Sequence, residues 1–386
     1  MKLLHLADLH LGKNVVGLSM IDSQRYVLEQ AIGLCKKEGI KNIIISGDVY
    51  DRSIPPEEAV TLLNGFLSKA ILDEKLHVYM ISGNHDSKER LACFNGILEK
   101  QGLFIDSNIN KDLSMHKHVI DEDGVTINIY SLPYIYPGEI RVLSGDDNIK
   151  DFESAIKKVL ENNTLNKDEI NILNAHYFVT KNDAEPIRSD SEVRTSVGAI
   201  EQMSYQLFDD FDYVALGHLH CPQHIGRETV RYAGSPLRYS VDEISQRKSF
   251  TVINIKSKDD ITIEQIDIKP LYEFVCLEGS VDELTKDSEI KDERIIYFKL
   301  TDITHVINAA TRLKIKYPHY VGLEYINIKS DVYDEDNNLE KVEGFDELSI
   351  SEQFNEFFNY INEKDLDEIQ LEAVNTVSKE LEKEGE

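Results

Sequence analysis

The chain has 386 residues, more than a single hydrophobic core usually serves, so we expect at least two domains. Hydrophobic residues make up 41% of it, as in a folded globular protein, and no apolar run is long enough to span a bilayer. The formal net charge of −28 argues against a protein that grips nucleic acid unaided, because DNA affinity comes largely from Lys and Arg that neutralise phosphates.

The first third of the chain alternates buried strands with helices, which is typical of α/β proteins. Strands are predicted over residues 2–7, 42–46 and 76–81, and helices over residues 23–37, from Pro55-Pro56 to about Leu72, and from about Ser87 to Lys100. Later strands are predicted over residues 125–132, 170–175 and 213–216, with a helix over residues 151–161. Strands around Val230 and through residues 250–268 are expected to be antiparallel.

The pattern changes after Lys269-Pro270, where a small α+β unit is predicted over residues 271–330. Its strands are expected over residues 272–277, 294–300 and 323–328, with a helix near residues 305–316. An acidic linker over residues 331–345 then leads to a helical tail over residues 346–386. Residues 181–196 are polar and irregular, and we interpret them as a mobile loop over a site.

The N-terminal sequence and the cysteines predict a cytoplasmic protein. Asp8 and His10 interrupt the apolar N-terminal stretch, which the core of a signal peptide does not tolerate. The four cysteines show no CxxC spacing, so free thiols in a reducing compartment are expected.

Five predicted strands end in short loops that carry metal-ligand residue types. The loops are Asp8-x-His10, Asp48 with Asp51 in GDVYD, Asn84-His85-Asp86 in GNHD, His176, and His218-x-His220 in GHLH. Gly47, Gly83 and Gly217 precede three of them and permit sharp turns, so that the side chains can converge at one edge.

This set of residues suits a site for two divalent metal ions. Two ions ~3.5–4 Å apart repel each other, and a bridging carboxylate offsets that repulsion. A mixture of His, Asp and Asn ligands favours manganese, iron or zinc, whereas magnesium prefers oxygen and water. We therefore predict two divalent cations, with manganese the leading choice.

The order DxH, GDxxD, GNHD, H, GHxH resembles the pattern of the calcineurin-like metallophosphoesterases. The stretch from GHLHCPQ through Tyr232 to Tyr239 (YAGSPLRY) is similar to the SbcD family of bacterial nucleases within that group. The resemblance covers about residues 1–270. It implies an α/β fold of two packed β-sheets flanked by helices, with residues 271–330 as a capping domain.

The resemblance also implies a role for each residue of the five loops. One metal ion would be held by Asp8, His10, Asp48 and His220, and the other by Asp48, Asn84, His176 and His218, with Asp48 bridging. His85 corresponds to the catalytic histidine that stabilises the leaving oxygen. Asp86 and Asp51 would orient His85, although some relatives carry a histidine at the position of Asp51.

The activities implied are 3′ to 5′ exonuclease action on double-stranded DNA and endonuclease action on single strands and hairpins. An SbcC-like ATPase would be the partner, in DNA repair, recombination or replication. The alternative is a phosphatase or small-molecule phosphodiesterase of the same superfamily, which the net charge favours. A scaffold without catalysis is disfavoured because none of the ligands is missing.

Substrate contacts and interfaces are less sharply predicted. Arg52, Lys88, Arg90 and Arg188 lie near the motifs and are candidates for contacting DNA. Apolar residues on the two helices after the metal loops suit either the core or a homodimer interface: Leu62, Phe66, Leu91, Phe94 and Leu98. The tail's apolar faces suit docking on the chain itself or on the ATPase partner. We interpret His5 as a packed strand residue, and we expect His116-x-His118 to lie in a polar loop.

Overall fold

A computed structural model describes residues 1–122, 124–181, 186–192, 202–286 and 291–328, with isolated positions between 349 and 378. The chain divides into two units, Met1–Ile328 and Lys329–Glu386, which are considered separately. The predicted acidic linker lies outside the described residues, as does most of the predicted helical tail. Within the described part of the chain, no helix is long and apolar enough to cross a membrane.

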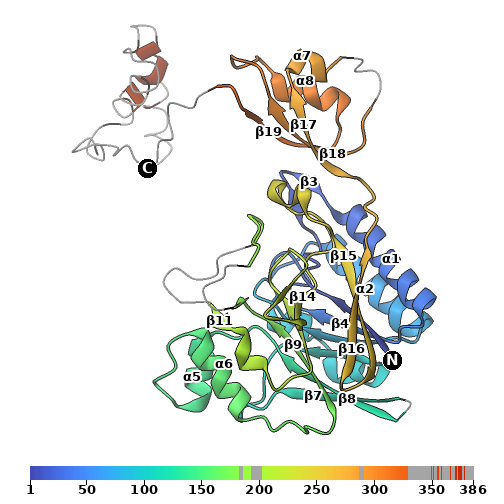
Figure 1. The fold of residues 1–386 in the computed structure, drawn as a ribbon. Helices are drawn as coiled ribbons and strands as arrows, with labels where there is room; N and C mark the ends of the chain where they lie inside the picture. Colours follow the sequence, from blue (N-terminus) through green and yellow to red (C-terminus); the bar gives the residue numbers. More distant parts are fainter. Residues whose placement is uncertain are drawn as a thin grey trace. The chain divides into compact units, whose positions relative to one another are not determined.

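Two six-stranded sheets form the larger part of the first unit (Figure 1). The first has the order β16-β15-β1-β4-β5-β6 and contains β1 (Lys2–Leu6), β4 (Asn42–Ser46), β5 (His77–Ile81), β6 (Leu103–Asp106), β15 (Ser249–Ser257) and β16 (Asp260–Asp267). The second has the order β13-β14-β12-β9-β8-β7 and contains β7 (His116–Glu122), β8 (Val125–Leu132), β9 (Ile170–His176), β12 (Tyr213–Gly217), β13 (Gln223–Ile225) and β14 (Arg227–Tyr232).

Four adjacent strands of each sheet run parallel. β1, β4, β5 and β6 are parallel in the first sheet, and β8, β9, β12 and β14 are parallel in the second. Leu3 and Ile44 of the first sheet share one buried apolar cluster with Ile172 and Tyr213 of the second, so the sheets pack face to face. The carboxyl ends of parallel strands lie at the same edge of a sheet, which is where the five predicted metal loops occur.

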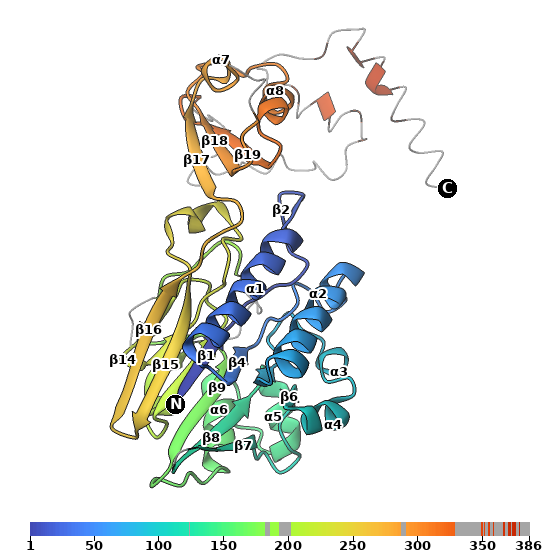
Figure 2. The same ribbon diagram turned by 90° about the vertical axis from the view of Figure 1, so that its right-hand side faces the viewer.

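Helices cover the outer faces of both sheets and bury their apolar sides. α1 (Ile21–Glu38) and α2 (Glu57–Ser68) lie side by side on the first sheet, and α5 (Pro137–Ser144) and α6 (Phe152–Glu161) cover the second (Figure 2). α2 continues into a π-helical turn over Lys69–Asp73. The predicted fold class, a mixed α/β arrangement of sheets flanked by helices, is confirmed.

The helix predicted over residues 87–100 is broken into α3 (Lys88–Leu91), α4 (Asn95–Leu98) and a 3₁₀ turn (Glu99–Gln101). Phe94 has φ +63°, which interrupts the helical path. The side chain of Asn95 accepts a hydrogen bond from the Ile105 amide at 3.2 Å, so this turn is held to β6. Asn and Gly at positions 95 and 96 are poor helix formers, and the local contact decides the conformation.

Residues 274–325 form a separate three-stranded parallel sheet. It contains β17 (Phe274–Gly279), β18 (Ile295–Leu300) and β19 (Tyr320–Tyr325), with α7 (Val281–Leu284) and α8 (Ala309–Lys316) in the connections. Its own apolar core includes Phe298 and Leu313. Phe274, Ile295 and Val321 instead join the core beneath the first large sheet, so the small sheet is packed on it. The last strand begins three residues before the predicted position.

Two histidine predictions have different outcomes. His5 is a packed strand residue, with Nδ1 3.0 Å from the Tyr213 hydroxyl and Nε2 3.0 Å from Ser46 Oγ. The predicted polar loop around His116 and His118 is wrong, because these residues begin the edge strand β7. Polar side chains on an exposed edge strand resemble a loop in sequence. His118 Nε2 lies 2.7 Å from Asp106 Oδ2 and has a structural role.

The shortest elements complete the described part of the chain. They are β2 (Asn14–Val15), β3 (Leu18–Ser19), β10 (Val179–Thr180), β11 (Met203–Ser204) and the 3₁₀ helices η3 (Tyr205–Phe208) and η4 (Val241–Ser245).

Candidate metal centre

The five predicted metal loops follow β1, β4 and β5 of the first sheet and β9 and β12 of the second, and they meet at one edge. Main-chain hydrogen bonds join the first two loops, from the Asp8 amide to Gly47 O at 3.2 Å and from the His10 amide to Asp48 O at 2.9 Å. A carboxylate joins the sheets, because Asp8 Oδ1 accepts the His218 amide at 2.9 Å. The site is therefore built across the junction of the two sheets.

Backbone strain is concentrated at this junction. Asp8, His10, Asp48 and His218 have φ values of 52°, 43°, 47° and 107°, in the left-handed region that non-glycine residues rarely adopt. Each such residue costs on the order of 1–3 kcal/mol, so the surrounding hydrogen bonds must hold it. Strained backbone of this kind gathers at functional sites, and here it aims four side chains toward the junction.

Three glycines make room for these side chains. Gly47 has φ +82°, the turn conformation that the sequence predicts. Gly83 and Gly217 have ordinary φ values and are required for space instead. A Cβ on Gly83 would lie 2.1 Å from Asp48 Oδ1, and one on Gly217 would lie 1.9 Å from Ser46 O. The ligands can therefore converge only because these positions carry no side chain.

One half of the site, called here the His220 half, gathers Asp8, His10 and His220. One ligand atom from each of the three residues lies within 4.8 Å of the other two. His10 Nε2 and His220 Nε2 face each other at 3.1 Å. Asp8 Oδ2 is buried and, within the described residues, has no hydrogen-bond partner.

The other half, called here the His176 half, gathers Asn84, His176 and His218. Asn84 Oδ1 lies 3.0 Å from His176 Nε2 and 3.2 Å from His218 Nδ1. His176 Nδ1 donates to the Ser46 carbonyl at 2.7 Å, which leaves its Nε2 directed at the site. The amide oxygen of Asn84 and the two imidazoles therefore converge, as ligands of one ion would.

Asp48 lies between the two halves. Its Oδ2 is 3.7 Å from His10 Nε2 in the His220 half and 3.3 Å from His176 Nε2 in the His176 half. Burial alone would raise the pKa of the Asp48 carboxyl, but the charge and hydrogen bond of His176 are the main interactions that hold it well below its usual range. A permanently ionised carboxylate in this position can be shared by two cations.

The two halves differ in protonation. Burial lowers the pKa of His10 and of His218 to about 3, so both are neutral near pH 7. Burial acts in the same direction on His176, but the Asp48 carboxylate outweighs it and raises the pKa of His176 to about 9. Burial also raises the pKa of the Asp8 carboxyl well above its usual value.

These residues fit a pair of divalent metal ions. Among the described residues Asp8 Oδ2 has no hydrogen-bond partner, and no cationic side chain bonds the facing Nε2 atoms of His10 and His220. Two nitrogens that each lie about 2.0–2.1 Å from one ion must be within about 4.2 Å of each other, and the 3.1 Å separation meets that condition. The donor set of imidazole, carboxylate and amide suits manganese, iron or zinc.

His85 stands beside Asp48, but its predicted orientation by two side chains needs correction. His85 Nδ1 donates to the main-chain carbonyl of Asp51 at 2.8 Å, and its Nε2 is 3.9 Å from Asp48 Oδ2. The Asp51 carboxylate accepts from Lys13 Nζ at 2.9 Å and lies 3.5 Å from His10 Nδ1. Asp51 thus orients His85 through its backbone.

The prediction that Asp86 orients His85 is wrong. The Asp86 carboxylate accepts main-chain amides of Val49 at 3.1 Å, Tyr50 at 2.9 Å and Gly83 at 2.9 Å. Burial and the nearby Asp48 raise the pKa of Asp86 to about 6, while those three amides act to lower it. Asp86 therefore clamps the loop after β4 to the loop after β5, because buried amides without a strand partner require an acceptor.

Sequence reasoning missed several residues that support the ligands from behind. Gln24 donates to His10 O at 2.7 Å, and the Tyr239 hydroxyl donates to Leu9 O at 2.6 Å. Glu243 Oε1 lies 3.0 Å from His220 Nδ1, and Glu192 Oε1 accepts the His220 amide at 2.7 Å. Two of these four residues lay in stretches that the sequence singled out, Tyr239 in the stretch similar to SbcD and Glu192 in the predicted loop over residues 181–196.

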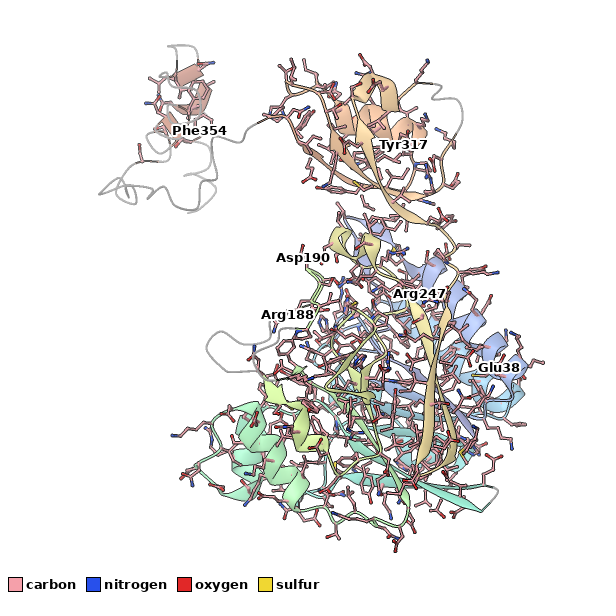
Figure 3. The ribbon with its side chains drawn as sticks, in the orientation of Figure 1. Glu38, Arg188, Asp190, Arg247, Tyr317 and Phe354 are labelled. Atoms are coloured by element: carbon pink, nitrogen blue, oxygen red, sulfur yellow. The ribbon has the colours of Figure 1, made fainter. Side chains whose placement is uncertain are left out.

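The four candidate substrate cations lie in different settings. Lys88 Nζ is bound by both oxygens of Glu139, at 2.8 and 2.7 Å, whereas Arg52 is exposed and 4.0 Å from Asp51 Oδ2. Arg90 lies on α3. Arg188, labelled in Figure 3, stacks at 3.8 Å on the Phe178 ring, whose centroid is 6.3 Å from that of His218. Arg188 is thus held beside the His176 half.

The helices after the metal loops place most of their predicted interface residues in the core. Leu62, Phe66 and Leu91 are buried, and Leu98 packs against the same cluster. Phe94 is 72% exposed. Core packing therefore accounts for four of these five residues, and only Phe94 remains available to a partner.

Residues 1–222 match the family model described as calcineurin-like phosphoesterase. The chain is also similar in fold to two solved structures. One is the protein TT1561 of Thermus thermophilus, with 12% sequence identity, coverage of 69% of this chain and 99% of that chain, and a TM-score of 0.41. The other is a dimetal phosphatase from Danio rerio, with 11% identity, coverage of 70% and 98%, and a TM-score of 0.39.

Proposed function

Since the chain belongs to the calcineurin-like phosphoesterase family, which implies a metal-dependent hydrolase, we propose that it is a DNA nuclease of SbcD type. The observation that carries the phosphodiesterase chemistry is the position of Asp48 between the His220 half and the His176 half, with His85 beside it. Asp8, His10, Asp48 and His220 would hold one ion. Asp48, Asn84, His176 and His218 would hold the other.

Two divalent ions, when bound, supply positive charge to the scissile phosphate and lower the pKa of the attacking water. The chain's own residues then position the phosphate and the leaving oxygen. Because His85 Nδ1 donates to the Asp51 carbonyl, its Nε2 faces the site near Asp48. We assign His85 to the leaving 3′-oxygen, which it would stabilise by donating a proton or a charged hydrogen bond.

DNA as the substrate is supported by features outside the metal centre. The stretch from Gly217 through Tyr239 has the resemblance to SbcD nucleases described above, and the sheet over residues 274–325 adds a second domain. Arg188 offers a cation beside the His176 half. Since the net charge of −28 disfavours a strong grip on DNA, we propose that an SbcC-like ATPase partner supplies it.

Two assemblies belong to this proposal. Residues 346–386 would dock on the ATPase, and the helices after the metal loops would pair in a homodimer through exposed residues such as Phe94. Deleting residues 346–386 should abolish co-purification with the ATPase and leave metal-dependent hydrolysis unchanged. Retained association would refute the docking assignment, and sedimentation of the isolated chain tests the dimer.

A phosphatase or small-molecule phosphodiesterase is the second candidate, because the −28 charge repels polyanionic DNA. Parallel assays with Mn²⁺ separate the candidates, using hairpin DNA, bis-p-nitrophenyl phosphate and p-nitrophenyl phosphate. A nuclease should cleave the hairpin and the diester. Activity confined to the monoester would favour the phosphatase. Asp48→Ala should abolish cleavage and His85→Gln should lower its rate about 10²–10⁴-fold, and rates like wild type in both would contradict the proposed site.

A further inference from the structure

The Glu243 carboxylate lies directly behind the metal ligand His220. It belongs to the 3₁₀ helix η4 and has no exposed surface. Its Oε1 is 3.0 Å from His220 Nδ1, on the side of the imidazole away from His10. This residue is 23 positions from His220 in the chain and lies outside all five metal loops.

Among the described residues, the other polar groups bonded to this carboxylate are all hydrogen-bond donors. Oε1 accepts the Ser189 hydroxyl at 2.6 Å and the Ser191 hydroxyl, and Oε2 accepts Lys248 Nζ at 2.7 Å and the Tyr239 amide at 3.2 Å. The buried ammonium group of Lys248 and the buried carboxylate of Glu243 compensate each other's charge, and neither Lys248 Nζ nor the Tyr239 amide can accept a hydrogen bond. Glu243 is therefore placed as a hydrogen-bond acceptor.

An acceptor at this place determines which tautomer His220 adopts. A neutral imidazole carries one N–H and one lone pair. Because an ionised carboxylate cannot donate, the proton must be on His220 Nδ1 and the lone pair on Nε2, which faces His10 Nε2 at 3.1 Å. That is the tautomer that can ligate an ion shared with His10 and Asp8.

We propose that Glu243 is the positioning residue for His220, and that it selectively sets the metal affinity of the His220 half. The inference rests on the proposed function, since it presumes the metal pair. The His176 half has no such dependence, because a main-chain carbonyl, Ser46 O, accepts from His176 Nδ1. Removing a carboxylate that is hydrogen-bonded to a ligating histidine commonly weakens metal binding about 10–100-fold.

The same carboxylate ties residues 186–192 to the metal ligand. Ser189 and Ser191 both bond Glu243, and Ser191 Oγ also lies 2.7 Å from His220 Nδ1. Glu192 accepts the main-chain amide of His220 at 2.7 Å. Arg188, which stacks on the Phe178 ring beside the His176 half, lies on the same segment.

The competing explanation is structural, because Glu243 also forms a buried ion pair with Lys248, whose side chain is 5% exposed. Three variants of the full chain separate the two roles. Glu243→Gln keeps the size and removes the charge, and Glu243→Gln with Lys248→Met also removes the unpaired buried lysine. Asp212→Asn is the matched control, a partly buried carboxylate 2.9 Å from Lys258 Nζ at the opposite end of β12.

Mn²⁺ titration by calorimetry, with spin-resonance detection of the bound pair, measures the result. We expect Glu243→Gln to weaken one of two sites about 10–100-fold and the other less than about threefold. The double variant should recover melting temperature without recovering that site, and Asp212→Asn should bind like wild type. The amide hydrogen exchange rates of residues 186–192 should rise in Glu243→Gln and remain as in wild type in Asp212→Asn.

Two wild-type-like sites in Glu243→Gln, equal weakening of both sites, or recovery of metal binding in the double variant would each overturn the positioning role. Binding of fewer than two ions by the wild-type chain would overturn the proposed metal pair as well. Normal wild-type binding and DNA cleavage together with an unaffected Glu243→Gln variant would overturn this inference alone.

Discussion

Each half of the metal centre combines two histidines with one oxygen ligand, Asp8 in one half and Asn84 in the other, but the halves are held by different parts of the fold. His176 is oriented by the carbonyl of Ser46, at the end of the central strand β4. His220 is contacted by the side chains of Ser191, from a segment before it in the chain, and Glu243, from a segment after it. One half is supported by the main chain of the sheet, and the other by a buried polar network.

This difference affects both charge and robustness. The main-chain carbonyl cannot be altered by substitution, whereas the network depends on a few side chains that must all be ionised or protonated correctly. His176 is protonated at neutral pH, with a pKa of about 9, whereas burial holds the pKa of His10 near 3. The halves should therefore respond differently to mutation and to pH.

The largest effect is expected at Asp48, where a substitution should affect both halves of the metal centre alike. Asp48 serves both halves, so Asp48→Asn should weaken both metal sites and lower hydrolysis of bis-p-nitrophenyl phosphate by at least on the order of 10³-fold. Titration of Mn²⁺ into the variant, alongside Asp212→Asn, measures this. Loss of only one ion, with the other bound normally, would show that Asp48 does not bridge.

His85 lies beside the two halves but is not proposed as a ligand of either ion, so its substitution should lower the hydrolysis rate without changing metal binding. His85→Gln is expected to retain both ions and to lower the rate about 10²–10⁴-fold, because the leaving oxygen loses its stabilising group. Metal content measured by atomic absorption, together with the rate, checks the prediction. A loss of bound metal would place His85 among the ligands, where one cluster with His10 and Asp51 would accommodate it.

The pH dependence of metal binding should distinguish the halves. Ligation requires neutral imidazole, so His176, with its raised pKa of about 9, must release a proton. The affinity of the His176 half for Mn²⁺ should rise about tenfold per pH unit from pH 7 and level off near pH 9. Calorimetry in two buffers measures the number of protons released when Mn²⁺ binds at pH 7. Compared with the wild-type chain, His176→Gln should release about one proton fewer, and His10→Gln should release the same number.

The smallest effect is expected at the edge of the His176 half. In the proposed nuclease Arg188, stacked on Phe178, would contact a phosphate beyond the scissile one, so Arg188→Ala should raise the KM for hairpin DNA about two- to fivefold. The rate on bis-p-nitrophenyl phosphate should stay within twofold, because that substrate has no further phosphate. An equal change on both substrates would place Arg188 at the reacting group, and no change on either would exclude it.

Much of this site could be predicted from the sequence because the information is local. Apolar strand patterns identify β1, β4, β5, β9 and β12, and the polar residues that follow each strand are adjacent in the chain. Parallel strands in one sheet then bring those residues to a common edge. The order of ligands and the α/β class follow from such patterns, without knowledge of how the two sheets pack.

Other features depended on contacts between distant segments. The sequence could not indicate that Asp86 would bind the amides of Val49 and Tyr50, or that Asn95 would bond β6 and interrupt a helix.

The sequence by itself determined which residues can ligate metal and that they lie at strand ends, because strand patterning is set by neighbouring residues. The tertiary structure alone decided that His10 and His220, 210 positions apart, face each other, and that Glu243 stands behind one of them. The physical reason is that a ligand's identity is a property of its side chain. Its tautomer, charge and direction are set by whatever the packing of two sheets places against it.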